Sequence, residues 1–389
     1  MKTRVRFVAL GGGQEVGASC YFLQINEWNI LLDCGKAPHL APQFSFILRP
    51  PFLESLRQIN HIFISHSHYD HVGELVYLAS ACTQGSIYAT PITKALIAYL
   101  FWDMGATYLG AKTSRQQEYE EIRIKTAISS IIAEGYCRPI PLPGYTVTFY
   151  EAGHIPGAAM VHIKTPDRSI LYTGDFSCQP SALTPSYILP HGLQFDTIIM
   201  CGLHAKHPSH TAARINRQTR LLMKSIHKKL EAGYSVYLET AQLTKAWEVL
   251  QVINDAMEKN SLPTVPVYID RYLLSLAENM ERMNVRVLKP WNHAGPGTVP
   301  GLWIGRKDPK AFYTLPNMQG YTKKVDFSLH PTYRELKHFI LTYNPKTVIL
   351  VHTGDDVEGA ANCLEAELMA CAACRSQFIY AEHGEIYTI

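Results

Sequence analysis

The chain has 389 residues, which is enough for two domains or for one large domain that carries an insertion. Apolar residues make up 47% of the chain and charged residues 18%, so a sizeable buried core is expected and wholesale disorder is excluded. The formal net charge of +3 is too small to indicate nucleic-acid binding by itself, so such a function would depend on where the charges lie.

Cysteine usage and hydropathy indicate a reduced, intracellular protein. The nine cysteines have no disulfide-like spacing, and no window approaches the roughly 18 apolar residues that a membrane helix needs. The opening MKTRVRFVALGGGQ is predicted to be a strand rather than a signal peptide. We therefore expect a cytoplasmic location, or a nuclear one if the source has a nucleus. Cys371 and Cys374 form a CxxC pair, which we interpret as a buried face of a helix over 363–375.

The first half of the chain alternates short β-rich runs with breaks at Gly, Pro, Asn and Asp. Strands are predicted at Val5–Leu10, Tyr21–Ile25, Asn29–Asp33, His61–Ser65, Thr146–Glu151, Met160–Thr165 and Ser169–Thr173. Helices are predicted over Gly73–Cys82 and Pro91–Met104. Because several strands follow one another with no helix between them, the fold class is a mixed α/β structure with hairpins, not a doubly wound sheet.

From about Leu203 the pattern changes to a small α/β unit. Its predicted elements, in order, are helix Ala212–Gly233, strand Ser235–Glu239, helix Thr244–Glu258, strand Val265–Asp270 and helix Leu273–Met283. A loop-rich stretch follows, and near Val325 the earlier style returns with a helix over Pro331–Tyr343 and the apolar strand TVILVH. The sequence therefore predicts one domain that is interrupted by another, with residues 1–202 and 326–389 in the first domain and 203–325 in the insertion.

The motif HSHYDH carries the strongest chemical signal. His66 and His68 leave a predicted strand two residues apart and can point to one side of a turn, whereas Asp70 and His71 are neighbours that must diverge. Imidazole nitrogen and carboxylate oxygen are zinc ligands. One ion cannot easily take all four side chains, so the motif predicts two ions, one on each pair.

Further metal-ligand residues follow other predicted strands. His154 lies in YEAGHIPG, Asp175 in LYTGDFS and His352 in VILVHTGD. Each comes after an apolar strand and near a glycine, which allows the backbone to approach closely. Taken singly each could be structural, but together they predict further ligands for the same centre.

In this order, Asp33 in LLDCG, the motif HSHYDH, His154 and Asp175 resemble the metallo-β-lactamase-fold hydrolases. LGGGQEVGASCYFL resembles the opening of the β-CASP nucleases, the branch that includes ribonuclease J and the endonuclease of pre-mRNA 3′-end processing. VDFSLH, which ends at His330, and PKTVILVH, which ends at His352, are similar to motifs B and C of that branch. The resemblance implies an αββα sandwich with an inserted β-CASP-like α/β domain.

The resemblance also implies roles for the residues. His66, His68 and His154 would hold one Zn²⁺, and Asp70, His71 and His352 the other, with Asp175 bridging and Mn²⁺ as an alternative metal. Asp33 would orient ligands and water. A histidine at motif C is typical of the members that cut RNA.

The chain departs from the family at motif A. The family has an acidic residue at the end of a strand there, and this chain has Cys201. The acid that would accompany His330 is therefore missing, so we expect a lower pKa or a less fixed orientation for this histidine. The insertion is also short, although Lys245 stands where the family has a basic residue.

The implied reaction is hydrolysis of a phosphodiester bond in RNA by a hydroxide that bridges the two zincs, because a zinc-bound water has a pKa near 7. Asp70 would hold the attacking water, and His330 would be the general acid for the leaving oxygen. RNA, favoured as a single strand, is the expected partner. A homo-oligomer or a processing-complex partner is also expected, and a membrane is not. The alternatives are a small-molecule metallo-hydrolase and an inactive RNA-binding scaffold subunit; endonucleolytic and 5′-exonucleolytic cleavage both stay open.

The insertion carries its own signal for RNA binding. Between Leu203 and Leu230 the sequence has no acidic residue. Its basic residues recur at three- and four-residue steps on one helix face, opposite the apolar positions. The predicted substrate-binding residues are Arg214, Arg217, Arg220, Lys224 and Lys228, together with Lys245. A stripe of one charge sign on a nearly neutral protein predicts a path for phosphates.

Overall fold

The computed structural model describes residues 2–37, 58–81, 85–105, 111–240, 244–287, 292–293, 301–305, 320–324, 329–353 and 363–389. The chain divides into two compact units. Unit 1 comprises Met1–Gln179, Pro185–Ser209 and His330–Ile389, and unit 2 comprises Pro180–Thr184 and His210–Leu329. The sequence predicts junctions at 202/203 and 325/326, and the compact units meet at 209/210 and 329/330. Residues 180–184 belong to unit 2, where the Glu248 carboxylate accepts a hydrogen bond from the Ala182 amide at 3.1 Å.

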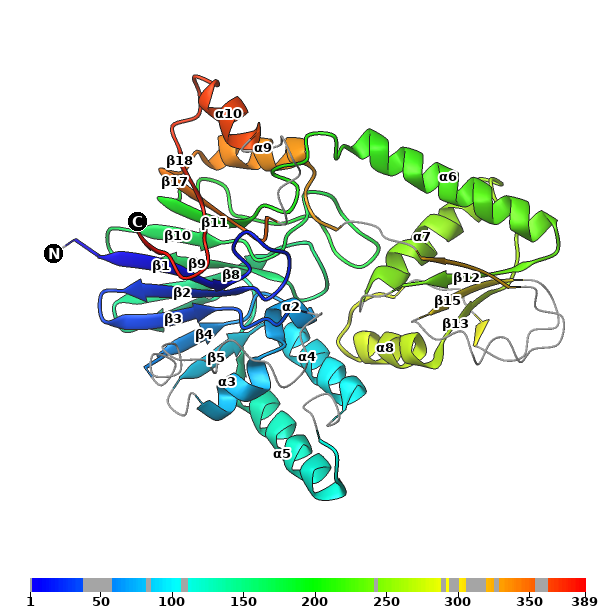
Figure 1. Cartoon of the computed structure of the whole chain (residues 1–389), viewed down its shortest axis with the longest axis horizontal. Helices are drawn as coiled ribbons and strands as arrows, with labels where there is room; N and C mark the ends of the chain where they lie inside the picture. Colours follow the sequence, from blue (N-terminus) through cyan, green and yellow to red (C-terminus); the bar gives the residue numbers. More distant parts are fainter. Residues whose placement is uncertain are drawn as a thin grey trace. The chain divides into compact units, whose positions relative to one another are not determined.

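Two seven-stranded sheets form the centre of unit 1 (Figure 1). In spatial order the first sheet contains β19 (Ile386–Thr388), β1 (Val5–Gly11), β2 (Cys20–Ile25), β3 (Trp28–Leu32), β4 (His61–Phe63), β5 (Ser86–Ala89) and β6 (Ile131–Ala133). The second contains β18 (Gln377–Tyr380), β17 (Thr347–Val351), β11 (Thr197–Cys201), β10 (Ser169–Tyr172), β9 (Ala159–Lys164), β8 (Tyr145–Glu151) and β7 (Pro139–Leu142). In both sheets the strands joined by hairpins are antiparallel. The chain's last strand, β19, is also antiparallel to β1, and the other neighbouring pairs are parallel. The predicted hairpins are therefore present.

The two sheets pack face to face. Phe7, Leu23 and Ile30 from the first sheet share one buried cluster with Val147 and Val161 from the second. Each such side chain contributes about 1.5–3 kcal/mol to the stability of the folded state when it is fully buried. The layer between the sheets is therefore a large apolar core of the unit.

Helices cover the outer faces of both sheets (Figure 1). The described helices of unit 1 are α2 (Tyr69–Val72), α3 (Leu75–Ala81), α4 (Pro91–Met104), α5 (Ser114–Ser130), α9 (Tyr333–Tyr343) and α10 (Cys363–Met369). Leu75, Ile97 and Ile124 pack in one cluster with Ile62 of the first sheet. On the other side, the Phe339 ring of α9 lies 4.9 Å from that of Phe176, which follows β10. The layers are helix, sheet, sheet and helix, which confirms the predicted αββα sandwich.

Unit 2 contains a five-stranded parallel sheet. Its strands, in spatial order, are β14 (Asn292–His293), β13 (Val267–Ile269), β15 (Leu302–Gly305), β12 (Ser235–Glu239) and β16 (Gly320–Lys324). Its helices are α6 (Ala212–Glu231), α7 (Lys245–Glu258) and α8 (Arg271–Arg282). Leu238 in β12, Trp247 and Leu250 in α7 and Leu276 in α8 are fully buried. This is the α/β unit that the alternating pattern predicts.

Two helical predictions are corrected. Helix α5 was not predicted, because only Ile124 and Ala127 of its residues are buried. The signal that could have revealed it is the capping box formed by Thr113 and Gln116. The predicted helix over 363–375 ends at Met369, and the partly exposed Cys371 and Cys374 follow it in a turn instead of lying on a buried helix face. Among the described residues, no helix is both long and apolar enough to cross a membrane.

Candidate metal centre

The predicted metal ligands follow the ends of strands in unit 1. His66 and His68 come after β4, His154 after β8, Asp175 after β10 and His352 after β17, and Asp70 and His71 lie in the short helix α2. Two glycines permit the backbone to come this close. A Cβ at Gly35 would lie 1.6 Å from the Asp70 carbonyl oxygen. Gly174 has φ of 53°, and its Cβ would lie 2.6 Å from the Ser65 Cβ.

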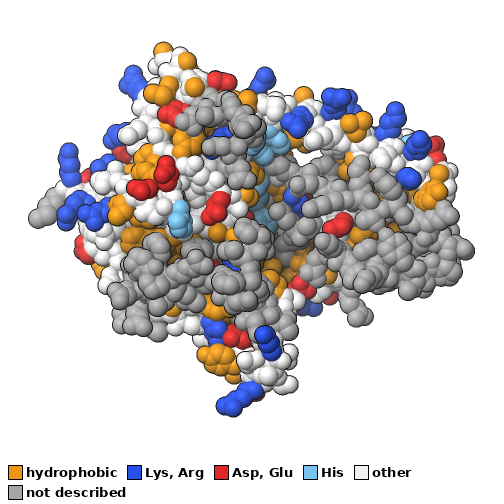
Figure 2. Space-filling model, in the orientation of Figure 1, with side chains coloured by type: hydrophobic (Ala, Val, Ile, Leu, Met, Phe, Trp, Pro, Cys, Tyr) orange, Lys and Arg blue, Asp and Glu red, His pale blue; other side chains and the backbone are white. Residues whose placement is uncertain are grey.

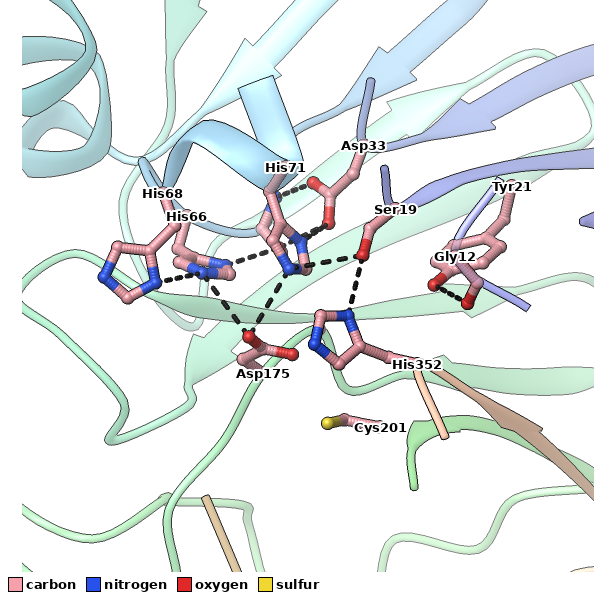
Figure 3. A network of polar contacts seen from close by, with 12 residues as sticks. Gly12, Ser19, Tyr21, Asp33, His66, His68, His71, Asp175, Cys201 and His352 are labelled. Carbon is pink, nitrogen blue, oxygen red and sulfur yellow. Dashed lines mark hydrogen bonds and ion pairs between the residues drawn. The ribbon is translucent and has the colours of Figure 1, made fainter. Parts of the chain in front are cut away.

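Three imidazoles and one carboxylate form the first part of the centre (Figure 3). Nδ1 of His68 is 3.1 Å from Nε2 of His66 and 3.2 Å from Nε2 of His154. Oδ2 of Asp175 is 3.8 Å from the same Nε2 atoms of His66 and His154. Nδ1 of His66 is bonded to the hydroxyl of Ser65 at 3.0 Å, which leaves Nε2 of that ring to face the other three side chains.

Asp70, His71 and His352 form the second part, with ligand atoms within 4.8 Å of one another. Nε2 of His71 is 3.4 Å from Oδ2 of Asp175, so this carboxylate lies between the two parts. The Ser19 hydroxyl is 3.3 Å from Nε2 of His71 and 3.1 Å from Nδ1 of His352. The structure therefore brings together all seven predicted ligands, from segments separated by nearly 300 positions in the chain.

Asp33 contacts His71 on the side of the ring away from Asp175, as Figure 3 shows. Its Oδ1 accepts a hydrogen bond from the Ser65 amide at 2.6 Å. Its Oδ2 accepts from the Ser65 hydroxyl and the Tyr172 hydroxyl, each at 2.6 Å, and pairs with Nδ1 of His71 at 2.7 Å. With its carboxylate occupied by these donors, Asp33 fixes the ring of His71 and turns Nε2 of that ring toward Asp175.

Burial and charge shift the titration of these groups. Burial alone would lower the pKa of His71, but the Asp175 and Asp33 carboxylates outweigh it and raise this pKa well above its usual value. Burial would raise the pKa of Asp175, but His71 and the other nearby imidazoles hold it well below the usual range. Burial lowers the pKa of His66. A neutral His66 imidazole and an ionised Asp175 carboxylate are the forms that bind metal.

The donor set and its spacing fit divalent cations such as zinc. Two nitrogens bound to one tetrahedral zinc at 2.0–2.1 Å lie about 3.3–3.4 Å apart. The nitrogens of His66 and His154 lie 3.1 and 3.2 Å from that of His68. Oδ1 of Asp175 is buried and makes no hydrogen bond to a described residue. A cation would satisfy this oxygen, which otherwise carries a desolvation cost.

His330 and Cys201 adjoin the centre. Nε2 of His330 is 3.8 Å from Oδ2 of Asp175, and its ring lies 4.8 Å from that of His154. Nδ1 of His330 is 3.5 Å from Sγ of Cys201. Burial lowers the pKa of His330 well below its usual value. The residue at the motif A position thus contacts His330 although it is a thiol.

The predicted substrate-binding residues lie in unit 2. Arg214, Arg217, Arg220, Lys224 and Lys228 are exposed on α6, and its buried residues Leu222, Met223, Ile226 and Leu230 lie on the other side of the helix. Figure 2 shows Lys and Arg side chains along this helix. A groove of about 550 Å³ beside them is lined by Arg220, Lys224 and His227 of α6 and by Lys259. Lys245 is half-buried at the first residue of α7 and does not belong to the α6 stripe.

Several supporting residues were not predicted. Ser19, Ser65 and Tyr172 hold the metal-centre side chains, but serine and tyrosine near strand ends are too common to reveal this role in a sequence. Lys36 and Glu74 form a fully buried ion pair, with Nζ 3.5 Å from Oε1. Lys36 lies three residues after Asp33 and Glu74 three residues after His71, and this nearness to predicted site residues is the sequence feature that could have pointed to the pair.

Comparison with known proteins gives two family matches. Residues 13–197 match the family model described as the metallo-beta-lactamase superfamily. Residues 316–368 match the Zn-dependent metallo-hydrolase RNA specificity domain.

Similar proteins include the transcription termination factor FttA of Methanosarcina mazei, which is 28% identical over 68% of this chain and 42% of its own length. The endoribonuclease ysh-1 of Neurospora crassa is 29% identical over 76% of this chain and 36% of its own. The chain thus spans less than half the length of these relatives. A solved structure of a protein of unknown function from Enterococcus faecalis V583 has a TM-score of 0.61 at 14% identity, over the whole of both chains, which is a likeness of fold.

Proposed function

The chain belongs to the metallo-β-lactamase superfamily, and on this basis we propose that it is a metal-dependent hydrolase that cleaves phosphodiester bonds in RNA. The observation that carries the proposal is that the seven predicted metal-ligand side chains form two adjoining groups, with the Asp175 carboxylate between them. The match to an RNA specificity domain and the relatives named for RNA cleavage and transcription termination support RNA as the substrate class.

The ligand atoms divide into sets for two ions. His66, His68 and His154 would hold one Zn²⁺, and Asp70, His71 and His352 would hold the other, with Asp175 between the two sets. Mn²⁺ is the alternative metal. Two such ions would supply an activated water at neutral pH and would neutralise charge that develops on the phosphate.

The chain's own residues complete the chemistry. Asp70 is only partly buried, so its second oxygen can hold the attacking water. Asp33 keeps the proton on Nδ1 of His71. His330 presents Nε2 beside Asp175 and gives its proton to the leaving oxygen. A bound phosphodiester adds negative charge beside the ring, which opposes the lowering of the His330 pKa by burial.

The basic face of α6 binds the RNA backbone, favoured as a single strand, and Lys245 contributes from α7. Both residue sets are exposed or partly exposed. The protein acts in the cytoplasm, or in the nucleus if the source has one. It acts alone, as a homo-oligomer or with a processing-complex partner.

The test is cleavage of one 5′-labelled and one 3′-labelled single-stranded RNA with added Zn²⁺ or Mn²⁺. The samples are wild type, wild type with chelator, Asp70→Ala, and Asp103→Asn as a control for an exposed acidic residue of α4. Loss of the Asp70 side chain is expected to reduce the rate about 10²–10³-fold, the size of effect seen when one charge-stabilising group is removed.

The fragment pattern separates internal cleavage from cleavage at the 5′ end. If metal-loaded wild type and Asp70→Ala are equally inert on varied RNAs and DNAs, the nuclease proposal is wrong. Faster turnover of thioesters, lactones or cyclic phosphodiesters would instead favour the small-molecule hydrolase. Tight RNA binding without cleavage by any metal-loaded sample would favour the scaffold subunit.

A further inference from the structure

One thiol lies beside the metal centre and has no role in the proposed ligand sets. Cys201 is the last residue of β11 and is 2% exposed. Ligand atoms of Asp175, Cys201 and His330 all lie within 4.8 Å of one another. Figure 3 shows the thiol next to Asp175, on the side away from His66.

Asp175 has one oxygen to spare on that side. Its Oδ2 faces the histidines of the two-ion centre, at 3.4 Å from His71 and 3.8 Å from His66. The residue is only 3% exposed, and its Oδ1 is buried without a geometrically defined hydrogen bond to a described residue. A buried carboxylate oxygen without a hydrogen bond is costly, and a cation is one way to satisfy it.

The free thiol itself is chemically quiet. Burial and the neighbouring Asp175 carboxylate raise the pKa of Cys201 well above its usual value. A divalent metal changes this, because a coordinating thiol is deprotonated.

The spacing of the thiol and the imidazole fits joint coordination. A sulfur at 2.3 Å and a nitrogen at 2.0–2.1 Å from one tetrahedral zinc lie about 3.5–3.6 Å apart. The observed distance from Sγ of Cys201 to Nδ1 of His330 is 3.5 Å. The ordinary alternative is a weak hydrogen bond from the thiol, either to Nδ1 of His330 or to the Asp175 carboxylate, and the metal titration below distinguishes it from coordination.

We propose that Sγ of Cys201, Nδ1 of His330 and Oδ1 of Asp175 form a third cation position for a thiophilic divalent metal such as Zn²⁺ or Co²⁺. The site shares Asp175 with the two-ion centre and in that respect rests on the proposed function. Binding replaces the thiol proton, which is released to solvent, with a metal–sulfur bond. A metal on Nδ1 would leave the His330 N–H on Nε2, the nitrogen that faces the centre, so the third cation would fix this ring with Nε2–H as a hydrogen-bond donor to the substrate.

The experiment is a Co²⁺ titration of the metal-free protein, in which near-ultraviolet absorption reports thiolate-to-cobalt charge transfer. In a parallel sample, native mass spectrometry counts the bound Zn²⁺ ions. Wild type is expected to bind three ions and to show the thiolate absorption. Cys201→Ser is expected to lose the absorption and to bind the third ion about 10–100-fold more weakly. Cys178→Ser, a change at a half-buried thiol of the same unit, is expected to behave as wild type.

A second variant keeps the test decisive if Cys201→Ser is unstable. His330→Ala leaves the thiol in place and is expected to lose the third ion while the first two are retained. Two ions in wild type with no thiolate absorption, or thiolate absorption that persists in Cys201→Ser, would overturn the third position. RNA cleavage measured on the same samples separates the two proposals. Cleavage with only two ions leaves the proposed function intact, and three ions with thiolate absorption but no cleavage leaves the third position intact.

Discussion

The candidate metal centre of unit 1 and helix α6 of unit 2 both gather polar side chains, but they hold them in opposite ways. In the centre the imidazoles and carboxylates are mostly buried, and neighbours such as Ser65 and Tyr172 fix them at 2.6–3.0 Å. Along α6 the cations are exposed, and helix geometry alone aligns them.

The difference follows from what each region would bind. A metal ion requires ligand atoms placed to within a few tenths of an ångström, so the residues behind the ligands matter as much as the ligands. A nucleic-acid backbone is attracted by charge over longer distances, so flexible exposed cations suffice. Substitutions behind the centre should therefore have large effects that depend on geometry, and substitutions on α6 small effects that depend on salt.

The largest expected effect is at the buried ion pair of Lys36 and Glu74. Both side chains are fully buried, and Glu74 N donates to Cys34 O at 2.9 Å, so the pair joins the turn after Asp33 to the turn after His71. Lys36→Met leaves a buried charge without its partner and is expected to lower the free energy of unfolding by about 3–5 kcal/mol. Urea unfolding measures this change.

The double variant Lys36→Met/Glu74→Leu should recover most of that loss, because both charges are gone. The matched control is Lys337→Met, which breaks an exposed pair with Glu367 at 2.9 Å and is expected to cost under about 1 kcal/mol. Equal losses at the two pairs would contradict the contrast between buried and exposed charges.

The second effect concerns pH and His162 in β9. Burial, with a contribution from Lys164, lowers the pKa of His162 to about 4 from an ordinary value of 6.5. As the pH falls, the imidazole of His162 therefore takes up a proton in the unfolded chain before it does so in the folded chain. The folded state is fully stabilised by the neutral ring above pH 6.5 and loses this stabilisation as the pH falls toward 4. The pKa shift corresponds to about 3 kcal/mol in the free energy of unfolding.

His162→Asn should remove this part of the acid destabilisation, as seen in unfolding curves of metal-free protein between pH 7 and 4. His227→Asn on α6, where the histidine is 37% exposed, should leave the wild-type pH dependence in place. A His162→Asn curve as steep as that of wild type would show that this histidine is not held neutral by burial.

The third effect is on metal affinity through Asp33. Asp33→Ala removes the carboxylate that orients His71 through Nδ1 and should weaken binding of the second ion about 10–100-fold, as measured by competition with a chromogenic chelator. Asp196→Asn, which changes a carboxylate paired with Lys346 on the other side of the same unit, should leave metal affinity unchanged. Unaltered affinity in Asp33→Ala would mean that His71 is positioned without it.

The smallest effect is on α6. Arg217→Gln/Lys228→Gln is expected to weaken binding of single-stranded RNA several-fold and to reduce the salt slope of the affinity by about one for each lost phosphate contact. It should change the free energy of unfolding by less than about 0.5 kcal/mol. Arg115→Gln on the exposed face of α5 is the control. An RNA affinity and a salt slope equal to those of wild type would remove α6 from the substrate path.

Local sequence determined the helices, the strands and the candidate ligand types wherever the pattern that predicts them lies within one short segment of the chain. The predicted helix Pro91–Met104 and strand Ser235–Glu239 have the observed bounds, because their start and stop residues and apolar spacing are properties of neighbouring positions. The spacing in the motif HSHYDH likewise predicted candidate ligands, and the structure places these side chains in groups whose ligand atoms lie within 4.8 Å of one another. Helix α5 is missing from the prediction, because it buries only two residues and shows no clear amphipathic pattern.

Only the tertiary structure decided which residues support the centre. Ser19 is bonded to His352, Tyr172 to Asp33, and Cys201 lies against His330, across separations of 333, 139 and 129 positions. No local pattern encodes such pairs, because they exist only where two sheets and their loops bring strand ends to one edge. The sequence could supply the metal-binding atoms, but the packing of the two sheets placed them around common points.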